Sequence, residues 1–96
     1  MSVLGAIIQQ PVDRLDYDFS CEQWFSEDDD IIQSVDVNIL PSGGSLSVNS
    51  FIADKEVKLW IEGGSHGEDY TVEFTITSVT GRKKQDEVRV LIRDFI

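Results

Sequence analysis

The sequence predicts an all-β protein, an antiparallel sandwich of about seven strands, on the basis of three observations. Apolar residues recur at every second position in six separate runs, which is the period of a strand with one buried face. Clusters of Gly, Pro, Asp and Ser separate these runs and supply turn chemistry. No window carries apolar residues at helical spacing over a length that would suggest a substantial helix.

The runs follow one another along nearly the whole chain. Their inward-facing residues are Leu15, Tyr17 and Phe19; Val35, Val37 and Ile39; Leu46 and Val48; Val57, Leu59 and Ile61; Tyr70, Val72, Phe74 and Ile76; and Val88, Val90 and Ile92. The turns between them fall at residues 27–30, 41–44, 53–55, 63–67 and 80–82. Short, evenly spaced strands of this kind are typical of an immunoglobulin or fibronectin type III sandwich, with a small barrel as the alternative.

A length of 96 residues indicates one domain. We expect the sandwich to occupy residues 11–96. Residues 1–10 are expected to form an N-terminal arm or an extra edge strand, because they are more apolar than a free tail needs to be. Such an arm could add a strand to the sheet of a neighbouring molecule.

The composition argues against several classes of partner. A formal net charge of −10 makes the chain unsuited to binding nucleic acid or an anionic membrane, since both require clustered Lys and Arg. A single cysteine, Cys21, rules out an intramolecular disulfide and fits synthesis in a reducing cytoplasm. The N-terminus lacks the basic and long apolar regions of a signal peptide.

A glycine-rich segment, Gly63–Gly64–Ser65–His66–Gly67, lies between two strongly patterned runs. Glycine loops that bind phosphate lead into a helix, whereas a strand follows here, so we interpret Gly63, Gly64 and Gly67 as turn residues. Tyr70 begins the next strand, where a tyrosine corner lies in immunoglobulin-like sandwiches. Its hydroxyl is expected to bond to the backbone of the turn before it.

The residues that could carry chemistry form no recognisable catalytic, cofactor or metal site. His66 is the sole histidine and lies in a turn, where neighbouring residues rarely converge as a catalytic triad does. Cys21 has no second thiol for zinc and is expected to be a packing residue. The acidic run Glu27–Asp30 is the best calcium candidate but lacks an EF-hand pattern, so we interpret it as a solvated acidic turn. We therefore predict no enzyme and no cofactor.

Two long segments resemble the bacteriophage fibre–tail adaptor proteins, a family of small immunoglobulin-like virion proteins. The segments are "PVDRLDYDFSCEQWFSEDDDIIQSVDVNI" and "VKLWIEGGSHGEDYTVEFTITSVTGRKKQDEVRVLIRD". The residues that match the family pattern are Trp24, Trp60, Gly63, Gly64, Gly67, Tyr70, Val72, Gly81 and Arg82. This resemblance implies a structural role in the virion, without catalysis and without a cofactor.

Two tryptophans and two charged segments are the candidate structural and interface positions. Trp24 is expected to close the core from its end. Trp60 lies on the face opposite Val57, Leu59 and Ile61, so it is either covered by another segment or exposed as a contact for a partner. Residues 13–30 hold eight acids and one base, and residues 82–93 hold five bases and two acids. Complementary patches of this kind favour assembly. The candidate interface residues are Trp60, Arg82, Lys83, Lys84, Glu27 and Asp28.

The function expected from these observations is that of a virion protein of the phage tail, synthesised in the host cytoplasm, which contacts other virion proteins and copies of itself. The basic segment Arg82–Lys84 is expected to meet the acidic run Glu27–Asp30 of a neighbour. The alternative is an immunoglobulin-like or fibronectin-like adhesion or carbohydrate-binding module of a bacterial surface protein.

Overall fold

The computed structural model describes residues 2–21, 30–41, 43–53 and 55–94, and within them it confirms the predicted all-β sandwich. Strands account for 71% of the described residues, which contain no helix. The seven strands are β1 (Ser2–Gln9), β2 (Arg14–Ser20), β3 (Ile32–Leu40), β4 (Leu46–Ala53), β5 (Glu56–Gly63), β6 (Asp69–Ser78) and β7 (Lys83–Ile92).

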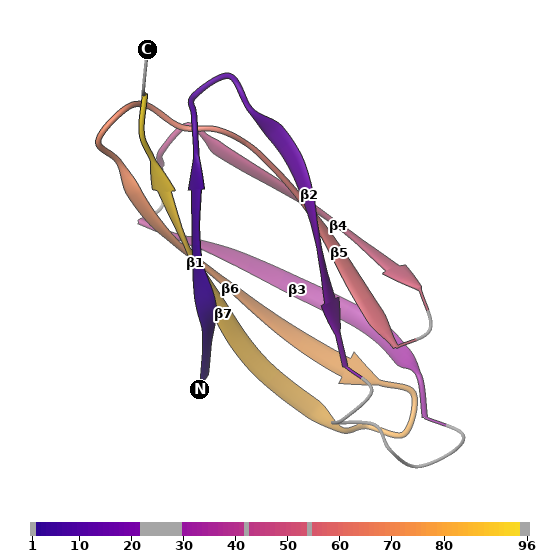
Figure 1. Cartoon of the computed structure of the whole chain (residues 1–96). Helices are drawn as coiled ribbons and strands as arrows, with labels where there is room; N and C mark the ends of the chain where they lie inside the picture. Colours follow the sequence, from indigo (N-terminus) through magenta and orange to yellow (C-terminus); the bar gives the residue numbers. More distant parts are fainter. Residues whose placement is uncertain (1, 22–29, 42, 54, 95–96) are drawn as a thin grey trace.

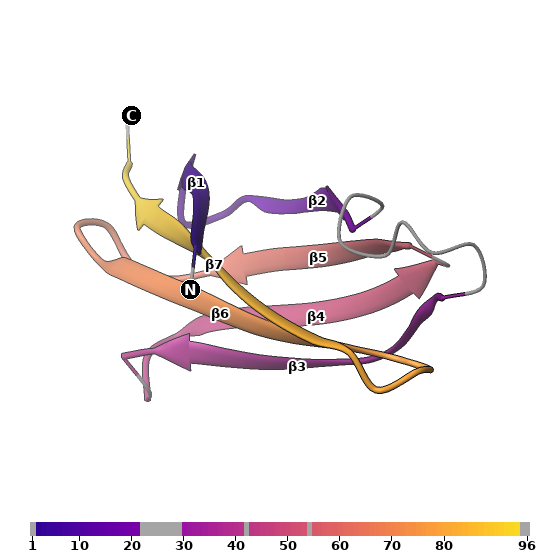
Figure 2. The ribbon, with the colours of Figure 1, turned by 90° about the horizontal axis from the view of Figure 1, so that it is seen from below.

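The strands form two sheets that pack face to face (Figure 1). The four-stranded sheet has the order β1-β7-β6-β3, and the three-stranded sheet has the order β2-β5-β4. All pairs are antiparallel except β1 with β7, which are parallel. Seen from below, the long strands of both sheets run in similar directions (Figure 2), as in aligned sandwiches. Strands β2, β5, β4 and β3, β6, β7 are divided as in an immunoglobulin sandwich, but β1 joins the sheet of β7 and not that of β2.

Alternation along the central strands produces the core. The inward residues of β5, β6 and β7 are almost completely buried: Val57, Leu59, Ile61, Tyr70, Val72, Phe74, Ile76, Val88, Val90 and Ile92. Each such apolar side chain contributes roughly 1.5–3 kcal/mol when it leaves water. Phe19 of β2 meets Phe74 of β6 across the sandwich, with ring centroids 5.2 Å apart. The two sheets are therefore joined by aromatic as well as aliphatic packing.

The N-terminal segment is an edge strand of its own sheet. Residues Ser2–Gln9 pair with β7, so the segment supplies a strand within the same molecule. The register shifts between Val3 and Ala6, next to Gly5 at φ 145°. Ile7 packs against the core, and the Gln9 side chain is buried.

A second register shift, between Ile32 and Ser34, explains the start of β3. Ile32 is buried, and the residues packed against the core farther along are Val35, Val37 and Ile39. Strict alternation would put Ile32 and Val35 on opposite faces of the strand. The irregularity lets both positions face inward, which a period of two could not predict.

Candidate functional site

The turn between β5 and β6 is closed by its own residues. Gly63, Gly64 and Gly67 adopt φ of 89°, 86° and 87°, in the left-handed region that favours glycine. The Glu68 carboxylate accepts a hydrogen bond from the Ser65 amide at 2.6 Å. The turn then leads directly into strand β6. The three glycines thus reverse the chain here.

The hydroxyl of Tyr70 connects two turns. It accepts a hydrogen bond from the Ser45 amide at 3.3 Å and donates one to Glu68 Oε1 at 2.8 Å. The sequence predicted a bond to the backbone of the preceding turn; here the backbone partner is Ser45, in the connection between β3 and β4, and the preceding turn supplies a carboxylate. A Cβ on Gly44 would lie 2.6 Å from the tyrosine ring, so the ring needs glycine at that position.

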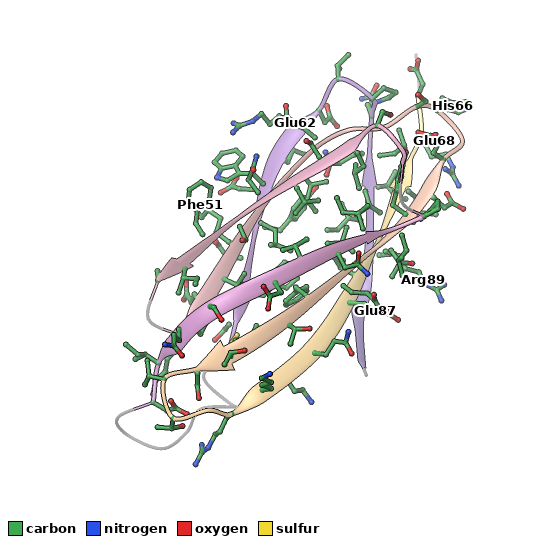
Figure 3. All side chains as sticks on the ribbon, turned by 180° about the vertical axis from the view of Figure 1, so that it is seen from behind. Phe51, Glu62, His66, Glu68, Glu87 and Arg89 are labelled. Carbon is green, nitrogen blue, oxygen red and sulfur yellow. The ribbon has the colours of Figure 1, made fainter. Side chains whose placement is uncertain are left out.

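The C-terminal end of β7 is held against the same turn. The Gly67 amide donates to the Ile92 carbonyl at 2.8 Å, and the Asp94 amide donates to His66 Nδ1 at 2.8 Å. Arg93 pairs with Asp69 at 2.9 Å. Figure 3 shows His66 and Glu68 close together at this end of the molecule. His66 is exposed, as expected for a turn residue, and its ring nitrogen accepts a hydrogen bond from the backbone that follows β7.

Asp30 lies at the opposite end of the sandwich and is buried, with 2% of its surface exposed. It accepts a hydrogen bond from the Thr80 hydroxyl at 2.9 Å, and Arg82 Nε lies 3.8 Å from Asp30 Oδ2. Burial raises the pKa of the Asp30 carboxyl, but hydrogen bonds from Thr80 and Ser78 and the charge of Arg82 outweigh this and lower it. The interpretation of the acidic run as a solvated turn is therefore wrong for Asp30, whose carboxylate anchors the β6–β7 turn.

The candidate interface residues are distributed unevenly over the structure. Arg82 is half-exposed and is directed to Asp30 of its own chain. Lys83 and Lys84 lie at the start of β7, with Lys83 exposed. Trp24, Glu27 and Asp28 lie outside the described residues. The core position of Trp24 and the contact role of Glu27 and Asp28 therefore remain predictions from the sequence.

Trp60 faces outward from β5 and is partly covered. The guanidinium carbon of Arg14 lies 4.4 Å from the centre of the indole ring, and Arg14 also pairs with Glu62 at 3.6 Å. A cation over an indole face is a favourable contact. Trp60 is therefore half-buried on the surface of the three-stranded sheet, beneath a side chain of β2.

Beside Trp60, the outer face of this sheet combines ion pairs with an exposed aromatic ring. Lys58 of β5 lies 3.1 Å from Asp16 and 3.8 Å from Asp18, both on β2. These neighbours raise the pKa of Lys58, with the hydrogen bond that Lys58 donates to Asp16 as the largest cause. Phe51 of β4 is 56% exposed. Figure 3 shows Phe51 and Glu62 on this side of the molecule, and Glu87 and Arg89 on the other.

Cys21 is a packing residue, as the sequence predicted. Its side chain is fully buried in the core cluster. Burial first, and then the charges of Asp86 and Glu56, raise the pKa of the Cys21 thiol to about 11. A thiol held protonated in this way is a weak nucleophile.

Three positions important to this geometry escaped sequence reasoning. Asp30 looked like one more acid in a charged run, and nothing local distinguishes it. Gln9 is buried because it joins the two sheets, which is a tertiary effect. The outward direction of Phe51 could have been found from the sequence, because Phe51 has an odd number and the inward residues Leu46 and Val48 have even numbers. Its outward direction follows from that parity alone.

In the part of the chain that the structure describes, no group of three or more His, Cys, Asp or Glu side chains is arranged to hold a metal ion. No helix in the same residues has the length and apolar character needed to cross a bilayer.

The comparisons with known proteins give one family. Residues 9–91 match the model of a family described as "Podophage GP4 fiber-tail adaptor protein gp77". The match begins at the last residue of β1 and ends within β7, so it takes in strands β2 to β6 whole. No curated protein matches the chain.

Proposed function

The chain belongs to the podophage fibre–tail adaptor family, and on that premise we propose that it is a non-enzymatic structural protein of the phage tail that links tail and fibre components through protein–protein contacts. The observation that carries the proposal is the family match across residues 9–91, which covers most of the chain. The resemblance carried by short motifs and the match over residues 9–91 agree on the same family.

The partners that we propose are other virion proteins and, in addition, further copies of this chain. An adaptor family implies binding to tail or fibre proteins. A net charge of −10 disfavours nucleic acid and anionic lipid as partners, because both are polyanions. The place of action is accordingly the virion tail, after synthesis in the host cytoplasm.

The surfaces proposed for these contacts are those where apolar or basic side chains remain accessible. Phe51 and the half-covered Trp60 occupy the outer face of the three-stranded sheet. Lys83, at the start of β7, adds an exposed positive charge on the other sheet. Arg82 is a weaker candidate, since its guanidinium already pairs with Asp30. The fold offers no reason to place catalysis at any of these positions.

Deletion of the gene, with complementation in trans, tests the proposal directly. Particles grown without the protein should contain heads and tail proteins at normal ratios but lack fibres when their composition is measured by quantitative mass spectrometry. Expression of the chain from a plasmid should restore the fibres. Normal fibre content in the deletion particles would contradict the linking role.

A further inference from the structure

Each sheet of the sandwich ends in two edge strands, and three of the four carry features that discourage pairing with another chain. β1 has a register shift next to Gly5, and β3 has one between Ile32 and Ser34. β2 carries Arg14, Asp16 and Asp18 along its length. Irregular register and charged side chains are the usual means by which proteins protect sheet edges.

The fourth edge strand, β4, has none of these protections. Its sequence, LSVNSFIA, contains no charged residue, no proline and no glycine. It pairs with β5 in unbroken register from Leu46 to Ala53. Among the described strands, β5 alone pairs with β4, because β4 ends the order β2-β5-β4. In an antiparallel pair every second residue directs its backbone N–H and C=O away from the partner. A regular, uncharged row of such groups is a template for another strand.

Apolar side chains accompany this edge. Phe51 is 56% exposed on the outer face of β4, and the next residue, Ile52, is 42% exposed on the other face. Phe51 and Ile52 line a shallow groove of about 240 Å³ whose other walls include Asp18 and Glu56. On the neighbouring β3, which runs beside β4 in the other sheet (Figure 2), the inward residues Val35, Val37 and Ile39 remain only partly buried. An added strand would cover apolar surface here as well as backbone.

We infer that the free edge of β4 binds an extended segment of another virion protein, which adds a fourth strand to the β2-β5-β4 sheet. Main-chain hydrogen bonds along Leu46–Ala53 supply the register, and Phe51 supplies a side-chain anchor for alternate residues of the incoming strand. The inference rests on the proposed adaptor role and names the mode in which one partner is held.

Charge decides between a foreign segment and a second copy of the chain. Pairing two β4 edges would bring together two molecules that each carry a net charge of −10, and like net charges oppose association. The groove beside Phe51 lies on the paired side of β4, because its charged walls, Asp18, Glu56 and Lys58, belong to β2 and β5. The free edge itself belongs to a strand without charged residues in a chain of net charge −10, which favours an uncharged incoming strand from a neutral or basic partner.

Hydrogen exchange of the intact chain, free and in purified virions, tests the inference. Peptides covering Leu46–Ala53 should exchange more slowly in the particle, because the outward amides of β4 become bonded. Peptides covering the charged edge Arg14–Ser20 should change little and serve as the internal comparison. Equal exchange of β4 in the two states would overturn the inference while leaving the adaptor role intact. Absence of the chain from virions would instead contradict the adaptor role, and the inference with it.

Photo-crosslinking identifies the occupant. A benzophenone side chain introduced at position 51 should crosslink to a different virion protein, whereas the same group at Val12, 88% exposed in the β1–β2 turn, should not. A crosslink between two copies of the chain would overturn the assignment of a foreign segment. In a matched pair, Phe51→Lys should lower the number of copies per virion roughly tenfold, while Val12→Lys leaves it unchanged. Melting temperatures of the two variants close to that of the parent are the control for folding. Wild-type copy number for Phe51→Lys would contradict the role of this side chain as an anchor.

Discussion

Tyr70 is the residue whose role was predicted most closely from the sequence. We expect its hydroxyl to contribute measurably to the stability of the fold. Tyr70→Phe removes the acceptor for the Ser45 amide and the donor to Glu68. The expected loss is about 1–2 kcal/mol, because each of the two bonds has a usual net value of about 1 kcal/mol. Gly44→Ala should cost about 1–3 kcal/mol, because the methyl group enters the space of the tyrosine ring.

The double variant distinguishes this explanation from two independent effects. If the methyl group of Gly44→Ala displaces the ring, the hydroxyl bonds are already lost in that variant. The double variant should then lose less free energy of unfolding, measured by urea denaturation, than the sum of the losses of the two single variants. Gly67→Ala is the control, since its φ of 87° strains the backbone by about 1 kcal/mol but nothing lies near the added Cβ. Full additivity of Gly44→Ala with Tyr70→Phe would show that the ring does not move.

The Cys21 thiol provides a second test at the same scale. Its pKa is raised to about 11 by burial and by the charges of Asp86 and Glu56, so the reactive thiolate is scarce at mildly alkaline pH. We expect no alkylation by iodoacetamide in the native protein and complete alkylation in denaturant, as followed by mass spectrometry. Rapid alkylation of the native chain would mean that the thiol is accessible.

Single residues were predictable from sequence only where local chemistry decides their role. Glycines in a turn and a tyrosine at the start of a strand could be recognised from their neighbours. Ser45, the backbone partner of Tyr70, lies 25 positions away in the sequence, and only the packing of two turns brings it near. Asp30 is similar, because Thr80, its partner, is 50 positions away.

At the scale of elements, β1 is held to the opposite sheet by one side chain. Gln9 donates to the Ile61 carbonyl of β5 at 3.1 Å and accepts a bond from the Tyr17 hydroxyl of β2 at 3.1 Å. Gln9→Ala should destabilise the protein by about 2–3 kcal/mol, since these two bonds and a longer one to the Asp13 carbonyl, at 3.4 Å, are lost and buried polar groups are left behind. The neighbouring substitution Gln10→Ala is the control, with an effect expected below 1 kcal/mol. Equal losses for the two variants in thermal unfolding would contradict this account of β1.

The β6–β7 turn depends on the ionised form of Asp30. Its pKa lies below the ordinary value of 3.8, so the ionised carboxylate stabilises the fold above that pH, and the contribution is lost as the pH falls through the lowered value. Asp30→Asn should therefore be less stable than the parent at neutral pH, with the difference shrinking below about pH 4. Asp36→Asn, on the exposed face of β3, is the control. A stability difference for Asp30→Asn that is the same at neutral and acid pH would contradict this role.

The strands themselves were largely predictable, and their irregularities were not. Period-two patterns located six strands, because a sheet with one buried face imposes that period on the sequence. The last apolar run begins at Val88, yet β7 begins at Lys83, since the antiparallel pairing with β6 extends beyond the apolar residues. The shift at Ile32 and Ser34 escaped notice because a bulge interrupts the very pattern used to find the strand.

At the scale of the whole molecule, surfaces were harder to anticipate than the fold. The basic segment Arg82–Lys84 was expected to meet the acidic run Glu27–Asp30 of a neighbour. In the structure, Arg82 forms an ion pair with Asp30 of its own chain. The N-terminal segment was expected to be either an arm that could add a strand to a neighbour or an extra edge strand, and in the structure it is an edge strand of its own sheet. Segments that look unpaired in sequence are often paired by the fold, and the regular edge of β4 became visible only once the strand order was known.

The central claim is that this sandwich stands between tail and fibre in the virion, and cryo-electron microscopy of the parent particle tests it most directly. The account predicts density for a seven-stranded domain, with the strand orders β1-β7-β6-β3 and β2-β5-β4, at the junction where the fibre meets the tail. A map in which fibre and tail proteins contact each other directly, with no density for this chain at their junction, would contradict it.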